Sequence, residues 1–212
     1  MKLLVFGASG ATGIQVVKQA LEQGHFVTAF VRNPAKIEIK NANLDLVQGN
    51  VMDASSVRAA FDGHDAVLNC LGTSPNKVGT IRSDGTANIL RAMEQTDTRR
   101  IIVQTTLGFG DSVKSLDQTP WFFKYIIVPF LLKKTFADHE RQEEIIRQSS
   151  LNWTIVRPGG LTNGERTEKY RHGFAYDDET IKASISRADV ADFMLNQLTS
   201  EEYVRKITGL SY

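Results

Sequence analysis

The amino-acid sequence predicts an α/β fold, a doubly wound parallel sheet with helices on both faces. Short apolar runs alternate with helical patterns along the whole chain, as in strands joined by right-handed crossover helices. A glycine-rich turn directly follows the first apolar run. The 212 residues contain no internal repeat or linker, and this length fits one large domain better than two small ones.

The predicted elements follow this alternation in order. Apolar runs predict strands at residues 3–6, 26–31, 44–47, 66–71, 101–105 and 153–156. Helical spacing predicts helices after the first strand and at residues 55–61, 78–96, 138–149 and 188–198. The first helix ends at Gly24, and the last one begins with the capping-box pair Ser186 and Asp189. The polar, weakly periodic residues 161–180 predict a loop with short strand structure.

The turn at residues 7–13 carries three glycines between the first strand and the first helix. Gly7 lets the chain turn sharply off the strand, where a Cβ would clash. Gly10 removes a side chain that would hold a pyrophosphate away from the backbone, and Gly13 lets the helix lie close to the sheet. The helix N-terminus then faces the phosphates. Strand, glycine-rich turn and helix in this order predict a dinucleotide-binding, Rossmann-type fold.

Composition excludes several other classes of function. With 25 basic and 24 acidic residues the formal charge is +1, which gives no electrostatic case for binding nucleic acid. The single cysteine, Cys70, permits no internal disulfide and suits an inert core thiol. The apolar run at residues 121–132 contains Lys124 and is shorter than the roughly 20 residues of a membrane span. Because the first strand begins at once, without a signal peptide, we expect a soluble, cytoplasmic monomer.

The end of the second strand indicates which dinucleotide is bound. An NAD site usually has a carboxylate there for the ribose hydroxyls, and this chain has Arg32, followed by Lys36. Two cations in place of a carboxylate would attract the 2′-phosphate of NADP. The alternative is that both are ordinary solvated charges. We favour NADP as the cofactor.

Further stretches of the chain match a known family. The matching stretches are residues 6–13, 31–34, 49–51, 71–73, 84–89, 138–139, 156–159 and 185–190. On these residues the chain resembles the atypical short-chain dehydrogenase/reductases with an NAD(P)H-binding, NmrA-like domain. Within them it is most similar to the biliverdin-IXβ reductase and flavin reductase group. The resemblance implies that residues 1–212 form one NAD(P)-binding Rossmann domain, with a substrate cleft formed by its C-terminal segments.

The resemblance also implies which residues bind the cofactor. The pyrophosphate would lie on Gly7, Ser9, Gly10, Ala11, Thr12 and Gly13. The 2′-phosphate would be held by Ser9, Arg32 and Lys36, with adenine beside Asn50 and Val51. The ribose next to the nicotinamide would be lined by Leu71, Gly72 and Thr73. Thr105 and Thr106 would lie under the nicotinamide, with Pro158 and Gly159 at its other edge.

The chain departs from the wider superfamily in its proton donor. Tyr125 and Tyr170 are followed four residues later by Pro129 and Phe174, so neither forms the Tyr-x-x-x-Lys pair that exchanges a proton with a carbonyl. A flavin, bilin or quinone can accept a hydride without such a pair and take its proton from water. We therefore expect an NADPH-dependent reductase acting on flat conjugated small molecules. In the biliverdin and flavin reductases, a histidine tends to occupy the position of Gly160, which leaves the acceptor open.

Several residues have alternative interpretations. Thr106 is the candidate catalytic residue, through a hydrogen bond to the carboxamide or substrate, and is otherwise a strand threonine bonded to backbone. His139 is expected on a helix surface, or else beside the substrate. Residues 121–132 form a buried helix, a roof over the pocket or a partner surface. His25 and the other histidines lack metal-ligand spacing, so we expect no metal. The alternative function is a non-catalytic NADP(H) sensor or assembly factor.

Overall fold

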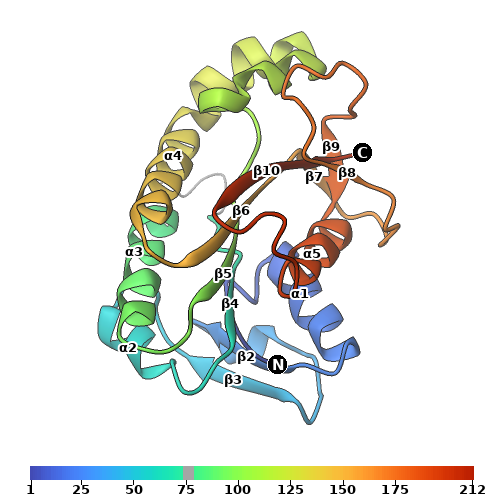
Figure 1. Ribbon diagram of the computed structural model, residues 1–212. Coiled ribbons are helices and arrows are strands. Elements are labelled where there is room, and N and C mark those ends of the chain that lie inside the picture. Colours follow the sequence, from blue (N-terminus) through green and yellow to red (C-terminus); the bar gives the residue numbers. More distant parts are fainter. Residues whose placement is uncertain (74–78) are drawn as a thin grey trace.

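The computed structural model describes residues 1–73 and 79–212. Helices cover both faces of a central sheet (Figure 1). Its strand order is β3-β2-β1-β4-β5-β6-β10-β8, and neighbouring strands from β3 to β10 pair in parallel. Strand β8 closes one edge by antiparallel pairing with β10. The single domain with a doubly wound sheet that the sequence predicts is therefore confirmed.

The elements have the following bounds. The strands of the large sheet are β1 (Lys2–Phe6), β2 (Phe26–Val31), β3 (Leu44–Gln48), β4 (Ala66–Asn69), β5 (Arg100–Gln104), β6 (Asn152–Pro158), β8 (Arg171–His172) and β10 (Lys206–Ser211). A small sheet pairs β7 (Gly160–Thr162) with β9 (Ser184–Ser186). The α-helices are α1 (Ala11–Glu22), α2 (Ala54–Ala59), α3 (Ile81–Glu94), α4 (Lys133–Gln148) and α5 (Arg187–Asn196). Shorter helical segments are η1 (Pro34–Lys36), η2 (Gly110–Gln118) and the π-helical η3 (Phe123–Leu132).

The core has two halves, one on each face of the sheet. On one face α1 and α5 pack together, and residues such as Val17 and Phe193 meet Leu3 and Val5 of β1. On the other face α2, α3 and α4 cover a cluster that includes Phe6 of β1. Successive residues of a strand point to opposite faces, so strands buried on both sides are apolar throughout. This is why the sequence shows them as continuous apolar runs.

The sequence predictions for individual elements differ from the structure mainly at their ends. Val78, the first residue of one predicted helix, lies outside the described residues, and α3 begins at Ile81. Helix α4 begins at Lys133 rather than at residue 138. Residues 161–180 contain only short strand pieces of β7 and β8, as predicted. Strand β10 was missed, because Lys206 and Gly209 interrupt its apolar pattern.

The interpretation of residues 121–132 as a buried helix is wrong. Trp121 is 69% exposed and Phe130 is 79% exposed, and none of the ten residues of η3 is buried. Pro129 lies inside η3 and lacks the N–H that a regular helix needs, consistent with the wider π-helical turn. Over the described residues, no helix is both long and apolar enough to cross a membrane.

Candidate functional site

A cleft of about 550 Å³ lies along the carboxyl ends of the parallel strands. Doubly wound sheets bind their ligands at this edge, near the point where the strand order reverses, which here lies between β1 and β4. The turn after β1 forms one part of its wall, and the loops after β2, β3, β4 and β5 contribute further parts. Helix α4 closes one side through Thr135, Phe136 and His139.

The glycine turn is packed as tightly as the sequence argument requires. Gly7 has a φ of +75°, and a Cβ on it would lie 2.3 Å from the carbonyl oxygen of Cys70. A Cβ on Gly13 would lie 2.1 Å from the Gly7 carbonyl oxygen, so the start of α1 rests directly on the turn. Neither site can accept a side chain.

The N-terminus of α1 has the properties of an anion cradle. Gly10 is its N-cap, and no side chain caps the helix. The first intrahelical bond runs from Ile14 N to Gly10 O, and the amides of residues 11–13 find no acceptor within the described parts of the chain. These free donors, together with the helix dipole, face a cleft whose floor is glycine backbone. A pyrophosphate group fits this arrangement.

Two cations lie at the end of the cleft beyond β2. Asn33 caps the short η1 turn by accepting a hydrogen bond from Ala35 N at 3.1 Å, and this turn brings Arg32 and Lys36 to the same part of the cleft wall. Neither cation forms an ion pair with any described residue. Their charges are therefore available to an anionic group.

The two threonines after β5 have different environments. The buried Thr105 donates its hydroxyl to Glu143 Oε1 at 2.8 Å, which fixes its rotamer. The half-buried Thr106 also lines the cleft, and its hydroxyl contacts the Leu107 carbonyl oxygen at 3.2 Å. The alternative interpretation of Thr106, a strand threonine bonded to backbone, expects such a contact. The hydroxyl oxygen still has lone pairs that can accept a further hydrogen bond.

A buried ion pair supports this wall from behind. Arg157 of β6 donates from Nε and Nη2 to the two carboxylate oxygens of Glu143, at 2.9 and 2.6 Å. Both side chains are almost fully buried. Burial lowers the pKa of Arg157, but the hydrogen bonds and charge of Glu143 outweigh it and hold that pKa above its ordinary value. Arg157 therefore stays charged, and its two hydrogen bonds to Glu143 tie β6 to α4.

His139 is buried against the cleft, so the expectation of a helix-surface histidine is wrong. Burial, together with the nearby charge of Arg82, lowers its pKa to about 3, so the imidazole is neutral at physiological pH. Its Nδ1 lies 3.3 Å from Gln142 Oε1, and Gln142 Nε2 donates to Thr86 at 3.0 Å. Because an amide oxygen only accepts, this network assigns the proton to Nδ1.

Asp138, next to His139, caps a different helix. Its carboxylate accepts hydrogen bonds from the backbone amides of Arg82 and Ser83, at 3.2 and 3.1 Å, in the first turn of α3. It also accepts the Ser83 hydroxyl at 2.6 Å and pairs with Arg82 Nη1 at 3.6 Å. The Asp138–His139 dipeptide thus joins α3 and α4 beside the cleft.

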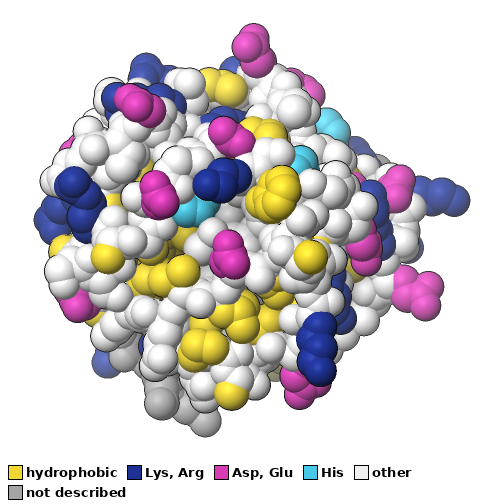
Figure 2. Space-filling view, turned by 90° about the horizontal axis from the view of Figure 1, so that it is seen from below, with side chains coloured by type: hydrophobic (Ala, Val, Ile, Leu, Met, Phe, Trp, Pro, Cys, Tyr) yellow, Lys and Arg dark blue, Asp and Glu magenta, His cyan; other side chains and the backbone are white. Residues whose placement is uncertain are grey.

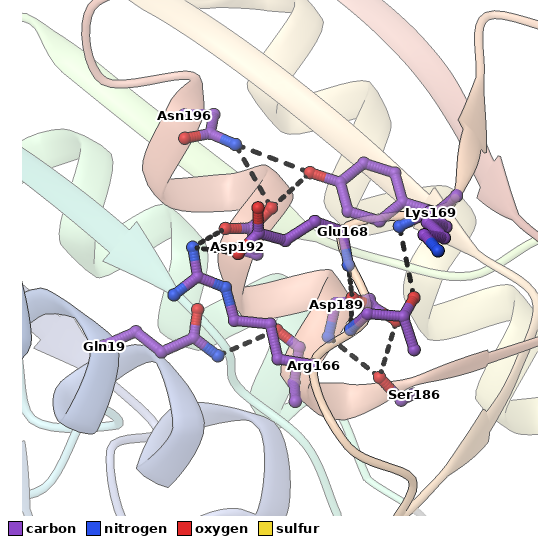
Figure 3. Close-up of polar contacts among 11 residues, drawn as sticks. Gln19, Arg166, Glu168, Lys169, Ser186, Asp189, Asp192 and Asn196 are labelled. Carbon is purple, nitrogen blue, oxygen red and sulfur yellow. Dashed lines mark hydrogen bonds and ion pairs between the residues drawn. The ribbon is translucent and has the colours of Figure 1, made fainter.

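A polar network holds the C-terminal segments beside α5 (Figure 3). The buried Asp189 accepts hydrogen bonds from the backbone amides of Thr167 and Glu168, at 2.7 and 2.9 Å, and from the Ser186 hydroxyl at 3.0 Å. Ser186 is the N-cap of α5, as the capping-box spacing predicts. Arg187 follows it and lines the cleft, with Nη1 donating to Asn163 at 2.7 Å.

The structure brings most of the proposed site residues to this one cleft. Those on its wall are Gly7, Ser9, Gly10, Ala11, Thr12, Arg32, Lys36, Val51, Leu71, Gly72, Thr73, Thr105 and Thr106. Those outside it are Gly13, which packs under the turn, Asn50, and the buried Pro158 and Gly159. Leu132 lines the cleft, as the pocket-roof alternative for residues 121–132 allows. Sequence reasoning missed other wall residues, among them Arg82, Gln104, Phe136, Leu161 and Arg187. They come from strands and helix faces that carry no recognisable spacing.

Comparison with known proteins agrees with the fold and with the cradle. The NAD(P)H-binding family model matches residues 7–201. An uncharacterised chloroplastic protein of Arabidopsis thaliana is 30% identical, over 99% of this chain and 76% of that protein. The uncharacterised Bacillus subtilis protein YwnB is 28% identical, over 96% of this chain and 94% of that protein. The photosystem II assembly factor Ycf39 of Synechocystis is 26% identical, over 97% of this chain and 61% of that protein.

Solved structures share the fold at lower identity. The oxidoreductase ylbE of Lactococcus lactis superposes with a TM-score of 0.83 at 21% identity, covering 99% of this chain and 90% of that one. ChuY of Escherichia coli, described as an anaerobilin reductase, superposes with a TM-score of 0.81 at 22% identity. The match covers 99% of this chain and 96% of that one. A Veillonella parvula short-chain dehydrogenase/reductase in complex with NADP gives 0.77 at 17% identity, covering 100% and 94%. The chain belongs to the NAD(P)H-binding family.

Proposed function

We propose that this protein is an NADPH-dependent oxidoreductase that transfers a hydride to a flat conjugated acceptor such as a flavin, bilin or quinone. The observation that carries the proposal is one continuous cleft. It joins a glycine cradle, and two cations without an ion pair among the described residues, to an end beside β5 and α4 where Leu132, Phe136 and Leu161 offer apolar surface. A dinucleotide needs the first two features, and a flat apolar acceptor needs the third.

In this proposal each part of the cofactor meets residues of matching chemistry. The free amides of α1 hold the pyrophosphate, and Ser9, Arg32 and Lys36 hold the 2′-phosphate. Val51 lies beside adenine, and residues 71–73 line the second ribose. Thr105 and Thr106 lie under the nicotinamide. When bound, the reduced nicotinamide supplies the hydride.

The residues at the acceptor end orient the acceptor rather than protonate it. Leu132, Phe136 and Leu161 supply apolar surface for a flat ring. The neutral His139 has no proton to give as an imidazolium at physiological pH. Thr106 donates or accepts a hydrogen bond, and an unperturbed hydroxyl is a poor acid. The proton therefore comes from water, which the open cleft admits.

The first test is cofactor selectivity. NADPH should bind more tightly than NADH, and Arg32→Ala should remove most of the difference, roughly 10–100-fold for a charged phosphate contact. Arg99→Ala is the matched control, because Arg99 is exposed just before β5, at the opposite edge of the sheet. Fluorescence titration of parent and both variants with the two cofactors measures this. Equal affinities in the parent would contradict the NADP assignment.

The second test is an acceptor screen that follows the loss of NADPH absorbance with FMN, biliverdin, quinones and simple aldehydes side by side. Turnover of the conjugated acceptors, with only a several-fold loss in Thr106→Ala, supports hydride transfer with protonation by solvent. Reaction with aldehydes or ketones alone would require a proton donor and would refute the mechanism. The anaerobilin reductase among the structural neighbours makes a bilin a natural first acceptor to try.

A second candidate function is a non-catalytic NADP(H)-binding sensor or assembly factor. The exposed apolar side chains of residues 121–131 favour it, because such a protein needs a partner surface. The assembly factor among the relatives points the same way. NADPH binding without turnover of any acceptor, together with a partner retained from lysate, would decide for it.

A further inference from the structure

The residues 121–134, here called the exposed segment, carry an unusual concentration of uncovered apolar side chains. Six large ones are exposed within eleven residues, namely Trp121, Phe122, Tyr125, Ile126, Phe130 and Leu131. Exposed apolar groups are normally scattered singly, and a continuous cluster marks a contact surface. The cluster projects from the body: η3 forms part of the yellow-green coils at the top of Figure 1, beyond the N-terminus of α4.

The charges of the exposed segment all have one sign. It contains Lys124, Lys133 and Lys134 and no Asp or Glu, although the whole chain has a net charge of only +1. Lys124 is bonded to Asp117, whereas Lys133 and Lys134 are exposed and form no ion pair within residues 1–73 and 79–212. Away from this end, on the face drawn in Figure 2, basic and acidic side chains are interspersed.

The kinds of side chain in the exposed segment match one environment. Trp and Tyr have an apolar ring and a polar group, and they are favoured where hydrocarbon meets water. Lysines reach from an apolar stem to anionic headgroups. A helix that combines an aromatic apolar surface with flanking lysines is typical of segments that lie in the plane of a membrane interface.

We propose that the exposed segment docks this protein on the surface of an anionic lipid bilayer, with the aromatic side chains in the interface and Lys133 and Lys134 at the headgroups. A second copy of the chain fits less well, because a two-fold contact would bring the same lysine-bearing patch against itself. This docking goes beyond the proposed oxidoreductase function and does not depend on it. It would also hold the cleft mouth near the membrane, since Leu132, Thr135 and Phe136 line the cleft from the same continuous helix.

The test is co-sedimentation of the protein with vesicles of phosphatidylcholine alone and of phosphatidylcholine with about a third phosphatidylglycerol, without cofactor or acceptor. The protein should bind the anionic vesicles and be released by salt. The double substitution Lys133→Gln/Lys134→Gln should weaken this partition roughly 25-fold, since each lysine near an anionic surface contributes about fivefold. Phe130→Ser should weaken it as well, by removing inserted apolar surface.

Matched controls distinguish docking through the exposed segment from nonspecific binding through any exposed lysine or apolar side chain. Lys18→Gln/Lys40→Gln removes two exposed lysines elsewhere, and Phe26→Ser removes a 55% exposed phenylalanine at the start of β2. Both controls should bind vesicles as the parent does. Loss of binding in the controls to the same degree would overturn the proposal, as would failure of the parent to bind anionic vesicles. A dimer in light scattering that Phe130→Ser disrupts would assign the surface to a second copy instead. Because no readout uses NADPH, failure here leaves the reductase proposal untouched.

Discussion

The Glu143–Arg157 pair should be the most sensitive charged contact behind the cleft. Arg157→Met leaves the Glu143 carboxylate fully buried with only the Thr105 hydroxyl at 2.8 Å as a donor among the described residues. Removing one partner of a buried ion pair costs about 3–5 kcal/mol, because the remaining charge stays desolvated. Arg157 also stacks over the Phe109 ring at 5.0 Å, which adds about 0.5–1 kcal/mol.

This loss is large against the total stability of a domain, about 5–15 kcal/mol. For a domain of this size it corresponds to a fall in Tm of roughly 6–20 °C. The double substitution Glu143→Leu/Arg157→Met removes both buried charges and should recover about 2 kcal/mol or more of the loss. The carboxylate that loses its partner, Asp111, is largely exposed. Arg171→Met is the matched control: its pair with Asp178 is partly exposed and should contribute no more than about 1 kcal/mol.

Urea unfolding followed by circular dichroism measures the free energy of unfolding of all four proteins. The reasoning is refuted if Arg157→Met loses less than about 1 kcal/mol, or if adding Glu143→Leu makes the protein less stable still. Either result would mean that water reaches Glu143 in solution and that the carboxylate does not depend on Arg157.

Two further predictions concern buried titratable groups. Because burial lowers the pKa of His139 to about 3 from 6.5, the unfolded chain binds a proton there first, and stability should fall as pH drops from about 6.5 towards 3. In urea titrations at several pH values, His139→Gln should make the free energy of unfolding fall less steeply with decreasing pH, by up to about 1.4 kcal/mol per pH unit. The same pH dependence in parent and variant would contradict the lowered pKa of His139. Burial raises the pKa of the Cys70 thiol to about 12. A thiol reagent at pH 8 should therefore label Cys70 only after denaturation, and rapid labelling of the native protein would show that this strand end opens.

The sequence predicts the fold and the phosphate end of the cleft because local rules govern both. Strands buried on two faces are continuous apolar runs, and a glycine such as Gly7 is required by its own backbone conformation. The acceptor end depends on tertiary contacts instead. Phe136 and Arg187 come from segments far apart in the chain, and only the folded sheet brings them together.

Two sequence predictions are wrong, the surface position of His139 and the buried helix at residues 121–132, and both fail for the same reason. A histidine beside Asp138 in a polar helix has the pattern of a surface residue, and only the packing of α4 on α3 buries it. Residues 121–132 have the composition of a buried helix, and composition alone does not say whether another element covers it. In the structure no described element buries η3, so the apolar run forms a surface.

One continuous helical stretch, η3 followed by α4, connects these features. Its first part is the exposed segment, its middle supplies Thr135, Phe136 and His139 to the cleft, and its later part holds Arg157 through Glu143. The polar and ionic contacts are buried where the helix crosses the sheet, and the apolar side chains are exposed where it leaves the sheet. This is the reverse of an ordinary surface helix, whose polar side faces water. The buried contacts of Glu143 with Arg157 and Thr105 hold α4 against β6 and the end of β5, so the helix forms one wall of the cleft while η3 stays exposed to another surface.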